Sequence, residues 1–393
     1  MRVGFVSAPL TSTTGYGKVT KEVCFRLADM GYEVVNVGGR LTSVVLGEKF
    51  YAWTPEGNRV LVVPVFGQTG DKATLEHYIG RYNLDVIISL YDAYVLNFGK
   101  PSKPWAAQIP IDTHLTSSWT RYVLNADYLV SMSWFGYEEL LKCFPDFMVR
   151  HIPHGCSPSV FRPRSDEERL EIRRKWGIPE NVVLYLSVAA NWGERKCLPQ
   201  LLIAFKRLLK THKDVMGYLY TNLRERCPQG YDLMTFAEQL GIADRVLGPK
   251  FNPMLDSVED ETLAELYAAS DVLVNVSLGE GFGLSIIEAQ ACGIPVIATN
   301  YSSMTELVQD RGWLVETVPR DVWEDVPVWI PLLARYPVPN LNSLLKCMND
   351  AYDNPERRKD YGKASRKFAL NYSWEKLMPK WDKLIKEMVE EKP

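Results

Sequence analysis

The stretch that most constrains the fold of this chain is LGEGFGLSIIEAQACGIPV, residues 278–296. It follows a short apolar run rich in valine, residues 272–276, which is typical of a strand buried on both faces. After Gly281 and Gly283, a run of apolar residues predicts a buried helix that ends at Gly293. The stretch therefore predicts a strand, a glycine turn and a buried helix.

This glycine turn predicts an anion site. The first N–H groups of a helix have no partner within the helix and lie at the positive end of its dipole. Because Gly281 and Gly283 carry no Cβ, an anion can approach the backbone closely. We expect a phosphate there, bound by the N–H groups of Gly283, Leu284 and Ser285.

Two carboxylates frame the turn, Glu280 before it and Glu288 within the helix. Helical side chains lean toward the N-terminus, so Glu288 is expected to reach toward the mouth of the loop. Carboxylates are repelled by phosphates, so both acids should accept hydrogen bonds from hydroxyls that flank the phosphates. A ligand with hydroxyls on both sides of a diphosphate is a nucleotide sugar. On these residues alone, a purely structural interpretation is as good as a nucleotide-sugar site. In it, Glu280 is solvated and Glu288 pairs with a basic residue.

The longer string decides between the two interpretations. Glu280 and Glu288, with seven residues between them in GEGFGLSIIEAQACGIPVIA, resemble the E-x7-E signature of retaining glycosyltransferases of family 4, the glycosyl transferases group 1. The resemblance implies the α/β GT-B fold, with two doubly wound Rossmann-like domains facing a central cleft and a C-terminal helix crossing back to the first domain. It implies that Glu280 holds hydroxyls of the donor sugar, that Glu288 holds the ribose, and that Phe282 lies in the donor loop.

Length and composition agree with this outline. A chain of 393 residues is long for one core. We predict an N-terminal, acceptor-side domain over 1–165, a C-terminal, donor-side domain over 166–370, and a final helix over 371–393. The formal net charge of -3 gives no indication of nucleic-acid binding, and the seven scattered cysteines without a C-x-x-C pair favour neither disulfides nor zinc. With no apolar run near the ~18 residues of a membrane span, we expect a cytoplasmic protein. Many members of the resembled family act on lipid-linked acceptors at a membrane surface, so peripheral contact with a membrane is also expected.

The N-terminal half predicts a βαβ start followed by further strands. Residues 1–8 and 33–37 are expected as strands, with a helix over 18–30 between them. Because ligands of such sheets gather beyond the carboxyl ends of strands, residues that follow the expected strands 85–90 and 105–111 are candidates. They are Tyr91 and Asp92 after the first of these strands, and Asp112 and His114 after the second.

The resemblance assigns roles to several of these N-terminal residues. TGYGKVTKEVCFRLADMGYEV looks like the family's N-terminal glycine loop, with Gly15 and Gly17 near the donor phosphates. A family histidine that contacts the transferred sugar is carried to His114, with Asp112 as the alternative, and Tyr91, Asp92 and Asp112 are expected on the acceptor side. Because Gly15-Tyr16-Gly17 is followed by Thr20 rather than glycine, a dinucleotide oxidoreductase is disfavoured.

A basic pair opens the second half. Arg195 and Lys196 follow an expected strand at 182–189 and precede a helix at 198–210, and the resemblance assigns them to the donor diphosphate. Each charge-assisted contact is worth roughly 1.5 to 3 kcal/mol. Many family members carry an arginine where Ala190 stands. Either Asn191 helps to bind the donor diphosphate, or this protein binds the diphosphate with fewer charges.

Four other segments carry expectations. The charged run 164–175 is expected as a linker and an exposed helix, and Ser302 or Ser303 as the cap of a later helix. The loop that holds Lys250 and Phe251 corresponds to the family's base-contacting loop. The proline-rich stretch 321–340 is expected as an irregular excursion.

The expected function is transfer of a hexose, with retention, from a UDP-, GDP- or ADP-sugar to the hydroxyl of a sugar, a glycolipid or another acceptor. The resemblance implies a front-face mechanism in which the leaving phosphate takes the acceptor proton. No D-x-D follows a strand, so neither a metal nor another cofactor is expected. The alternatives are a noncatalytic nucleotide-sugar-binding protein and a GT-B-like sugar phosphorylase or epimerase. The oligomeric state stays open.

Overall fold

The structure is a computed structural model that describes residues 1–38, 49–65, 71–96, 98–116, 121–224, 230–253, 256, 258–318 and 336–390. These residues form two compact units. The first comprises residues up to Gly155 together with the helix that begins at Trp374, and the second runs from Cys156 to Ser373. Most of the proline-rich stretch 321–340 lies outside the described residues.

The first unit is built on an eight-stranded sheet in the order β3-β4-β2-β1-β5-β6-β7-β8. All neighbours are parallel except β3 and β4. The central strand β5 is buried along its whole length, as a continuous apolar run in a sheet covered on both faces requires. The strands are β1 (Arg2–Ser7), β2 (Glu33–Gly38), β3 (Phe50–Trp53), β4 (Arg59–Val63), β5 (Val86–Leu90), β6 (Trp105–Gln108), β7 (Tyr128–Ser131) and β8 (Met148–His151).

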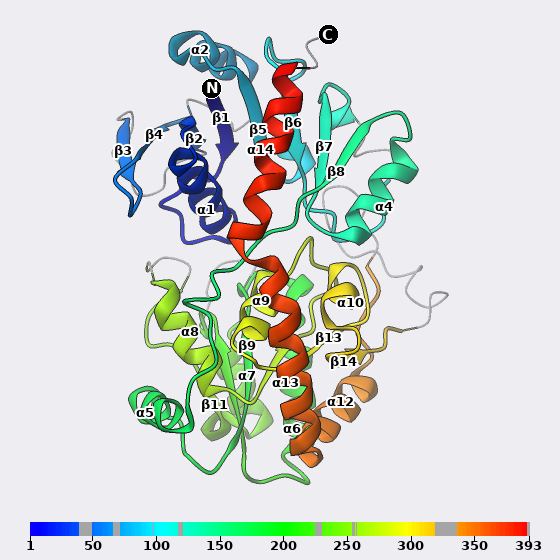
Figure 1. Ribbon diagram of the computed structural model, residues 1–393. Helices are drawn as coiled ribbons and strands as arrows, with labels where there is room; N and C mark the ends of the chain where they lie inside the picture. The colour runs from blue at the N-terminus through cyan, green and yellow to red at the C-terminus, as the bar shows by residue number, and fades with distance from the viewer. Residues whose placement is uncertain are drawn as a thin grey trace. The chain divides into compact units, whose positions relative to one another are not determined.

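Helices α1 (Gly15–Asp29), α2 (Lys72–Tyr82) and α4 (Trp134–Cys143) belong to this unit (Figure 1). Helix α1 begins at Gly15 rather than at residue 18, because the side chain of Thr14 accepts a hydrogen bond from the N–H of Gly17 at 3.2 Å. Gly15 and Gly17 of the expected N-terminal glycine loop therefore lie in the first turn of a helix.

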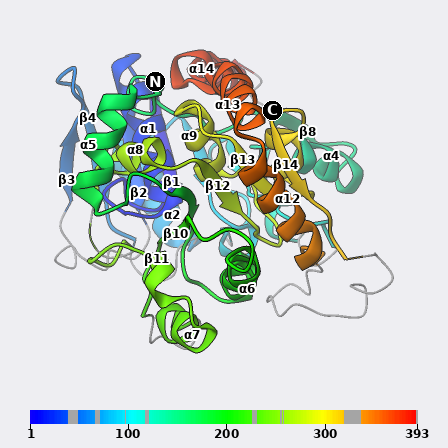
Figure 2. The ribbon, with the colours of Figure 1, turned by 90° about the horizontal axis from the view of Figure 1, so that it is seen from below.

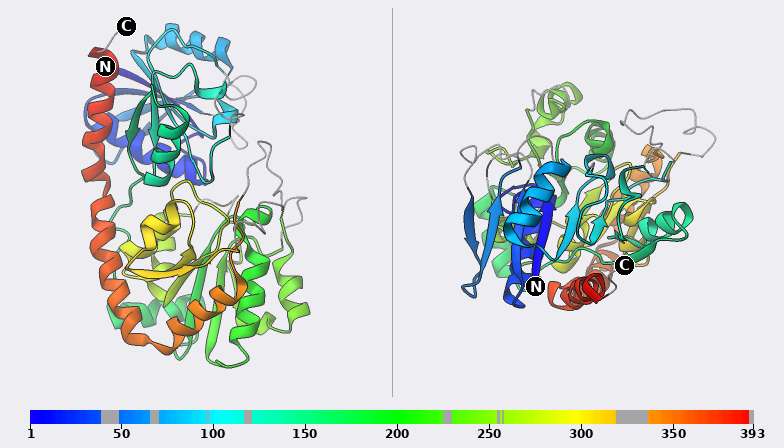
Figure 3. Two further views of the ribbon diagram at one scale, coloured as in Figure 1. Left: turned by 90° about the vertical axis from the view of Figure 1, so that its right-hand side faces the viewer. Right: turned by 90° about the horizontal axis from the view of Figure 1, so that it is seen from above.

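The last helix, α14 (Trp374–Glu390), packs on the first unit, as predicted for the C-terminal segment. Figures 1 and 3 show it in red along one face of the sheet, beside α1. Trp381 is 1% exposed and its ring centroid lies 6.4 Å from that of Phe5 in β1. Nearby, the hydroxyl of Tyr32 donates a hydrogen bond of 2.7 Å to Asp382. The apolar stripe of α14 is therefore part of the core of the first unit.

The second unit is built on a six-stranded parallel sheet in the order β11-β10-β9-β12-β13-β14. This is the doubly wound strand order of a Rossmann-like fold. The chain runs outward from β9 to β11 and then returns to β12 on the other side of β9. The strands are β9 (Val183–Val188), β10 (Val215–Tyr220), β11 (Val246–Leu247), β12 (Val272–Asn275), β13 (Val296–Thr299) and β14 (Gly312–Val315). The α/β class predicted from the sequence is confirmed in both units.

The helices of this unit pack in two groups. Helix α6 contacts α7 and α12, and α9 contacts α8, α10 and α13 (Figure 2). The helices are α5 (Asp166–Trp176), α6 (Leu198–Leu208), α7 (Leu233–Leu240), α8 (Asp260–Ala269), α9 (Leu284–Ala291), α10 (Ser303–Val308), α12 (Leu341–Asp353) and α13 (Pro355–Ala369).

Helix α5 is less exposed than its charged sequence predicted. Its Arg173 is 4% exposed and donates to Asp271 at 2.8 Å, next to β12. Arg169 donates to the other oxygen of the same carboxylate at 2.6 Å. The expectation of an exposed helix is confirmed for most of α5, but one face is anchored through a buried charge pair.

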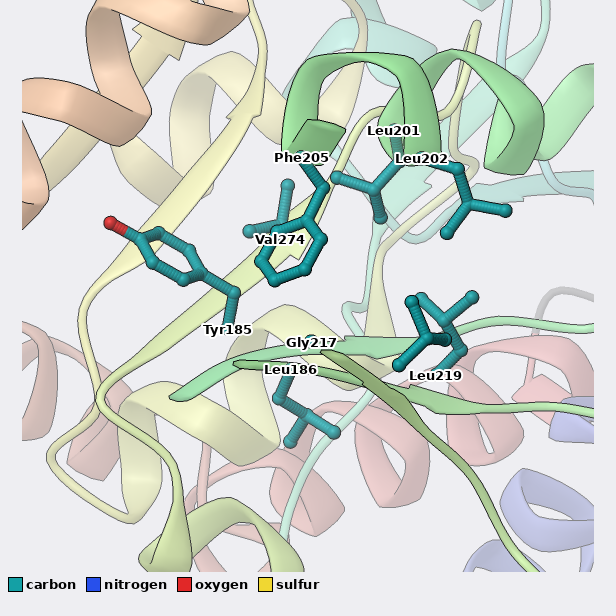
Figure 4. A pocket seen from close by; sticks show the side chains of 9 residues that line it. Tyr185, Leu186, Leu201, Leu202, Phe205, Gly217, Leu219 and Val274 are labelled. Atoms are coloured by element: carbon teal, nitrogen blue, oxygen red, sulfur yellow. The ribbon is translucent and has the colours of Figure 1, made fainter. Parts of the chain in front are cut away.

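A small apolar cavity lies between α6 and the sheet of the second unit. Figure 4 shows Leu201, Leu202 and Phe205 of α6 above the strands that carry Gly217 and Val274. A Cβ placed on Gly217 would lie 3.6 Å from the nearest atom of Phe205, which is ordinary van der Waals contact.

We therefore expect Gly217→Ala to raise the free energy of unfolding by about 0.5–1 kcal/mol, because alanine lowers the entropy of the unfolded chain and fills part of the cavity. Urea unfolding followed by circular dichroism measures the change. Gly248→Ala is the matched control and is expected to destabilise, because its Cβ would lie 2.5 Å from Leu223. Destabilisation by Gly217→Ala would contradict the prediction.

Among the described residues, no helix is long and apolar enough to cross a membrane.

Candidate active site

The loops that follow β9 and β12 meet at the carboxyl edge of the second sheet. Strands β9 and β12 are neighbours, and between them the chain reverses its direction of travel across the sheet. Ligands of doubly wound folds bind at such a switch point. The two loops are joined by a backbone hydrogen bond of 2.8 Å from Leu278 N to Arg195 O. The side chain of Arg195 also donates to the carbonyl of Gly279 at 2.8 Å.

Glu280 and the predicted basic pair come together at this switch point. Lys196 Nζ donates to Glu280 Oε1, and Arg195 Nη1 lies 3.6 Å from Glu280 Oε2. Ser277 Oγ donates to Glu280 Oε1 at 2.7 Å, and Asn275 Nδ2 lies 3.5 Å from the same oxygen. The side chains of Lys196 and Glu280 are only 12% and 13% exposed, so this ion pair is largely shielded from water.

The electrostatics of the pair keep Glu280 ionised. Burial raises the pKa of its carboxyl group, but the opposing charges of Lys196 and Arg195 and the hydrogen bonds of the site bring the pKa down to about 2. This lowered pKa stabilises the folded state above the ordinary pKa of 4.5, and that contribution is lost as the pH falls toward about 2. At neutral pH the site therefore holds one carboxylate and two cations.

The backbone of Glu280 is held from the start of α10. Its N–H donates to Ser302 Oγ at 3.0 Å, and Ser303 Oγ donates to its carbonyl at 2.7 Å. Ser302 stands at the N-cap position of α10, but its side chain does not cap the helix. The predicted cap position is therefore confirmed at Ser302, but its hydroxyl, like that of Ser303, binds the Glu280 loop instead of the first N–H groups of the helix.

The backbone around this cluster is strained. Among the described non-glycine residues with positive φ are Cys197 at 48° and Ser302 at 52°, one on each side of Glu280. Cys197 separates the short 3-10 turn Glu194–Lys196 from α6, so its left-handed conformation directs Lys196 toward Glu280. Strain of about 1–3 kcal/mol per residue persists only where the surrounding structure enforces it, which is typical of functional sites.

Helix α9 has the predicted glycine start. Gly283 is its N-cap, with φ of 100° and no side chain to cap the first N–H groups. Asn275 Nδ2 lies 3.4 Å from Ser285 Oγ, so the first turn faces the Glu280 cluster. The side chain of Phe282 is 3% exposed and packs on Tyr372, which leaves only its backbone for a ligand.

Glu288 has a partner that the sequence did not predict. It is 3% exposed and accepts a hydrogen bond of 2.9 Å from the hydroxyl of Tyr267, a buried residue of α8. Its role toward a ribose stays a prediction.

Asn191 holds a neighbouring loop. Its side-chain amide donates to Asn222 O at 2.9 Å and to Tyr231 O at 2.7 Å, and it accepts from Tyr231 N at 3.0 Å. All of these bonds are to backbone atoms, so the Asn191 side chain holds two loop segments together. One alternative from the sequence was that Asn191 contacts the donor diphosphate. That leaves Arg195 and Lys196 as the cations in the described part of this loop.

The predicted base-contacting loop follows β11. The ring of Phe251 lies edge-on to that of Tyr220, with centroids 6.2 Å apart, and Lys250 is exposed. The roles of both residues toward a nucleotide stay predictions.

The first unit has its own switch point, between β1 and β5. Tyr16, in the first turn of α1, lies against Tyr91 with ring centroids 5.5 Å apart, and its hydroxyl donates to Asp92. Burial and the Asp92 carboxylate raise the pKa of Tyr16 well above its usual value, and Asp112 contributes to this shift. The three predicted acceptor-side residues therefore gather around a tyrosine that the sequence did not single out.

The two predicted glycines of this unit differ in their surroundings. Gly15 is exposed at the start of α1. Gly17 is buried, and a Cβ there would lie 2.3 Å from Ser12 O, so the turn requires a glycine for packing reasons. Contact of either residue with phosphates stays a prediction.

His114 is held by a buried carboxylate. Its Nδ1 lies 3.1 Å from Glu139 Oε1, in α4, and its side chain is 55% exposed. Glu139 also accepts from Lys142 Nζ at 2.8 Å and from Leu115 N at 3.2 Å. Although burial raises the pKa of Glu139, these hydrogen bonds lower it below its usual value. The contact with Glu139 fixes the orientation of the His114 ring through Nδ1.

Sequence reasoning missed several residues that build these clusters. They have no short-range sequence signature. All except Glu139, which lies in the middle of α4, stand at the end of a strand or the start of a helix, where a search by position would have found them. They are Tyr16, Glu139, Asn275, Ser277, Ser302 and Ser303.

Comparison with known proteins gives a family match in the second unit. Residues 168–324 match the family described as glycosyl transferases group 1. A D-inositol 3-phosphate glycosyltransferase of Acidothermus cellulolyticus is 31% identical over 207 residues, which cover 49% of this chain and 43% of that protein. The chain therefore spans less than half the length of this relative.

Solved structures resemble the whole chain. Sucrose-phosphate synthase of Thermosynechococcus elongatus has a TM-score of 0.76 at 17% identity, with 100% of each chain covered. Anabaena HepE, in complex with UDP and glucose, has a TM-score of 0.72 at 16% identity, covering 98% of this chain and all of the other. At these identities the likeness shows the fold, and it confirms the predicted GT-B class with its two Rossmann-like units.

Proposed function

We propose that this chain, whose residues 168–324 match the glycosyl transferases group 1, moves a hexose from a nucleoside diphosphate sugar to an acceptor hydroxyl with retention of configuration. The observation that carries the proposal is the cluster of Arg195, Lys196 and Glu280 beside the glycine start of α9. A diphosphate is bound by cations and by the N–H groups at the start of a helix. The hydroxyls of its sugar donate hydrogen bonds to a carboxylate. The cluster offers all three.

The chemical task at this site is to stabilise the leaving group. Breaking the anomeric C–O bond leaves negative charge on the diphosphate, and preorganised donors that meet this charge are often the largest catalytic contribution. Lys196 and Arg195 lie together beside the start of α9, where both can contact the diphosphate as this charge develops. In the proposed front-face mechanism the departing phosphate oxygen takes the proton of the acceptor hydroxyl on the same face of the sugar.

Residues of the first unit serve the sugar and the acceptor in this proposal. His114, oriented by Glu139 through Nδ1, contacts a hydroxyl of the transferred hexose. Asp92 and Asp112 accept hydrogen bonds from acceptor hydroxyls, and Tyr91 packs against the acceptor. The acceptor is a sugar, a glycolipid or another hydroxyl compound.

The two cations and the dipole of α9 offset the diphosphate charge, so we propose that no metal is required. A thermal-shift panel tests the proposal: UDP, GDP and ADP, then their sugars, each with and without EDTA, with NAD as the control. We expect one nucleotide series to raise the melting temperature, because binding only to the native state stabilises it by about 2.7 kcal/mol at about 100 Kd. NAD should have no effect.

If the folded protein shows no shift with any nucleotide or nucleotide sugar, the proposed donor class is contradicted. If EDTA abolishes a shift, the proposed metal independence is contradicted. Binding without turnover in a broad set of acceptors would favour a noncatalytic binding protein. Turnover that requires free phosphate would favour a phosphorylase.

A further inference from the structure

Glu280 contacts the same two cations, Lys196 and Arg195, that the proposed function assigns to the diphosphate. Its Oε1 accepts from Lys196, and its Oε2 lies 3.6 Å from Arg195. A diphosphate that binds Lys196 and Arg195 therefore approaches a carboxylate, and two anions close together in a partly shielded site repel each other. The inference developed from this conflict rests on the proposed function.

A donor and its product nucleotide meet this conflict differently. The donor carries sugar hydroxyls beyond the diphosphate, and each hydroxyl can donate to Glu280 in place of the contact that Lys196 gives up. The product nucleoside diphosphate has no such hydroxyls, and its terminal phosphate carries an additional negative charge. The product therefore meets the repulsion of Glu280 without compensation.

We propose that Glu280 is the residue that discriminates the nucleotide sugar from the nucleoside diphosphate at this site. In the unliganded protein it acts as an internal counter-anion of Lys196 and Arg195. The sugar of the donor draws the carboxylate to its hydroxyls and releases the cations to the diphosphate. After transfer, the carboxylate returns to Lys196 and weakens the hold on the product.

The surroundings of Glu280 are suited to this exchange. Its backbone is held at both the N–H and the carbonyl by Ser302 and Ser303, so the carboxylate changes partners while the loop stays in place. Ser277 Oγ and Asn275 Nδ2 donate to the carboxylate from β12 and the loop after it. These neutral donors keep the ionised form solvated when Lys196 turns to the phosphate.

Glu280→Gln is the decisive variant, because it removes the charge and keeps a side chain of the same length. Isothermal titration with the nucleoside diphosphate identified by the panel, and with its sugar, gives both dissociation constants. We expect the nucleoside diphosphate to bind about tenfold more tightly than to the unmodified protein, the scale of one charge-assisted contact. The nucleotide sugar should bind no more tightly, so the preference for the donor falls.

Glu194→Gln is the matched control. Glu194 is exposed in the 3-10 turn next to Arg195 and carries the same charge, so its removal tests a general electrostatic effect. We expect less than about a twofold change in either dissociation constant, because interactions of exposed charges are screened. An equal gain in nucleotide affinity with Glu194→Gln would overturn the assignment to Glu280.

Glu280→Asp tests the proposal independently of the neutral variant. It keeps the charge and shortens the reach, so the nucleotide sugar should bind about tenfold more weakly while the nucleoside diphosphate changes less than about twofold. Equal weakening of both ligands would overturn the proposal, as would unchanged or weaker nucleoside diphosphate binding in a folded Glu280→Gln protein. If the unmodified protein binds neither ligand, the proposed function itself fails, and that outcome differs from all of these.

Discussion

Replacing Lys196 by methionine is expected to lower kcat/KM for glycosyl transfer by about 10²- to 10³-fold, the usual cost of removing one preorganised donor from a developing anion. Methionine keeps an aliphatic stem and removes the ammonium group that contacts Glu280. Because the charge on the diphosphate grows as the anomeric bond breaks, the loss should appear mainly in kcat. Initial rates over a range of donor concentrations at saturating acceptor measure the two constants.

Lys210→Met is the matched control for this prediction. Lys210 is exposed just beyond the other end of α6, so its replacement removes the same charge from the same region of the sequence without touching the cluster. We expect rates within about twofold of the unmodified protein, since changes at exposed positions away from special features are small. A Lys196→Met protein that melts normally and keeps near-normal turnover would remove Lys196 from the active site.

Replacing Trp381 by alanine is expected to lower the free energy of unfolding of the first unit by about 3–5 kcal/mol, because a fully buried aromatic side chain is lost and a cavity remains. Trp381 is 1% exposed and lies against Phe5 of β1. Since the chain has two compact units, unfolding need not be two-state. Calorimetry should therefore show the loss in the transition that includes the first unit.

Lys383→Ala on the same helix is the control for Trp381→Ala. Its side chain is 78% exposed and faces away from the apolar stripe, so we expect a change within about 0.5 kcal/mol. Equal effects of the two substitutions would show that α14 does not dock through Trp381.

The sheets show which strands a sequence can reveal. Those predicted include the central strands of both units, whose continuous apolar runs are a consequence of burial on both faces. The strands missed, β3, β8 and β14, all lie at a sheet edge. Their burial is partial, with alternating half-buried and exposed residues in β3 and one fully buried residue in β8. An edge strand is stabilised by one neighbour and partly faces solvent, so its local pattern is weak.

The candidate site divides in the same way. The glycine turn, the basic pair and the two acids were each identified, because each has a short-range pattern or matches a family motif. Their mutual contacts were not. Glu280 was expected to face ligand hydroxyls, yet it contacts Lys196, which is 84 residues away in the chain. Asn191 was weighed as a ligand, yet its amide holds the backbone of Asn222 and Tyr231.

Local sequence patterns are enough to predict the strand, glycine turn and helix at 272–291, the α/β class and the final helix, because these follow from periodicity and turn chemistry over a few residues. The pairing of Glu280 with Lys196, the hydrogen bond from Tyr267 to Glu288 and the proximity of Tyr16 to Asp92 depend on tertiary contacts. Each of these contacts joins loops or helices that sheet order brings together. A strand order of β9 beside β12, or β1 beside β5, depends on the packing of the whole unit. For that reason no local pattern contains it.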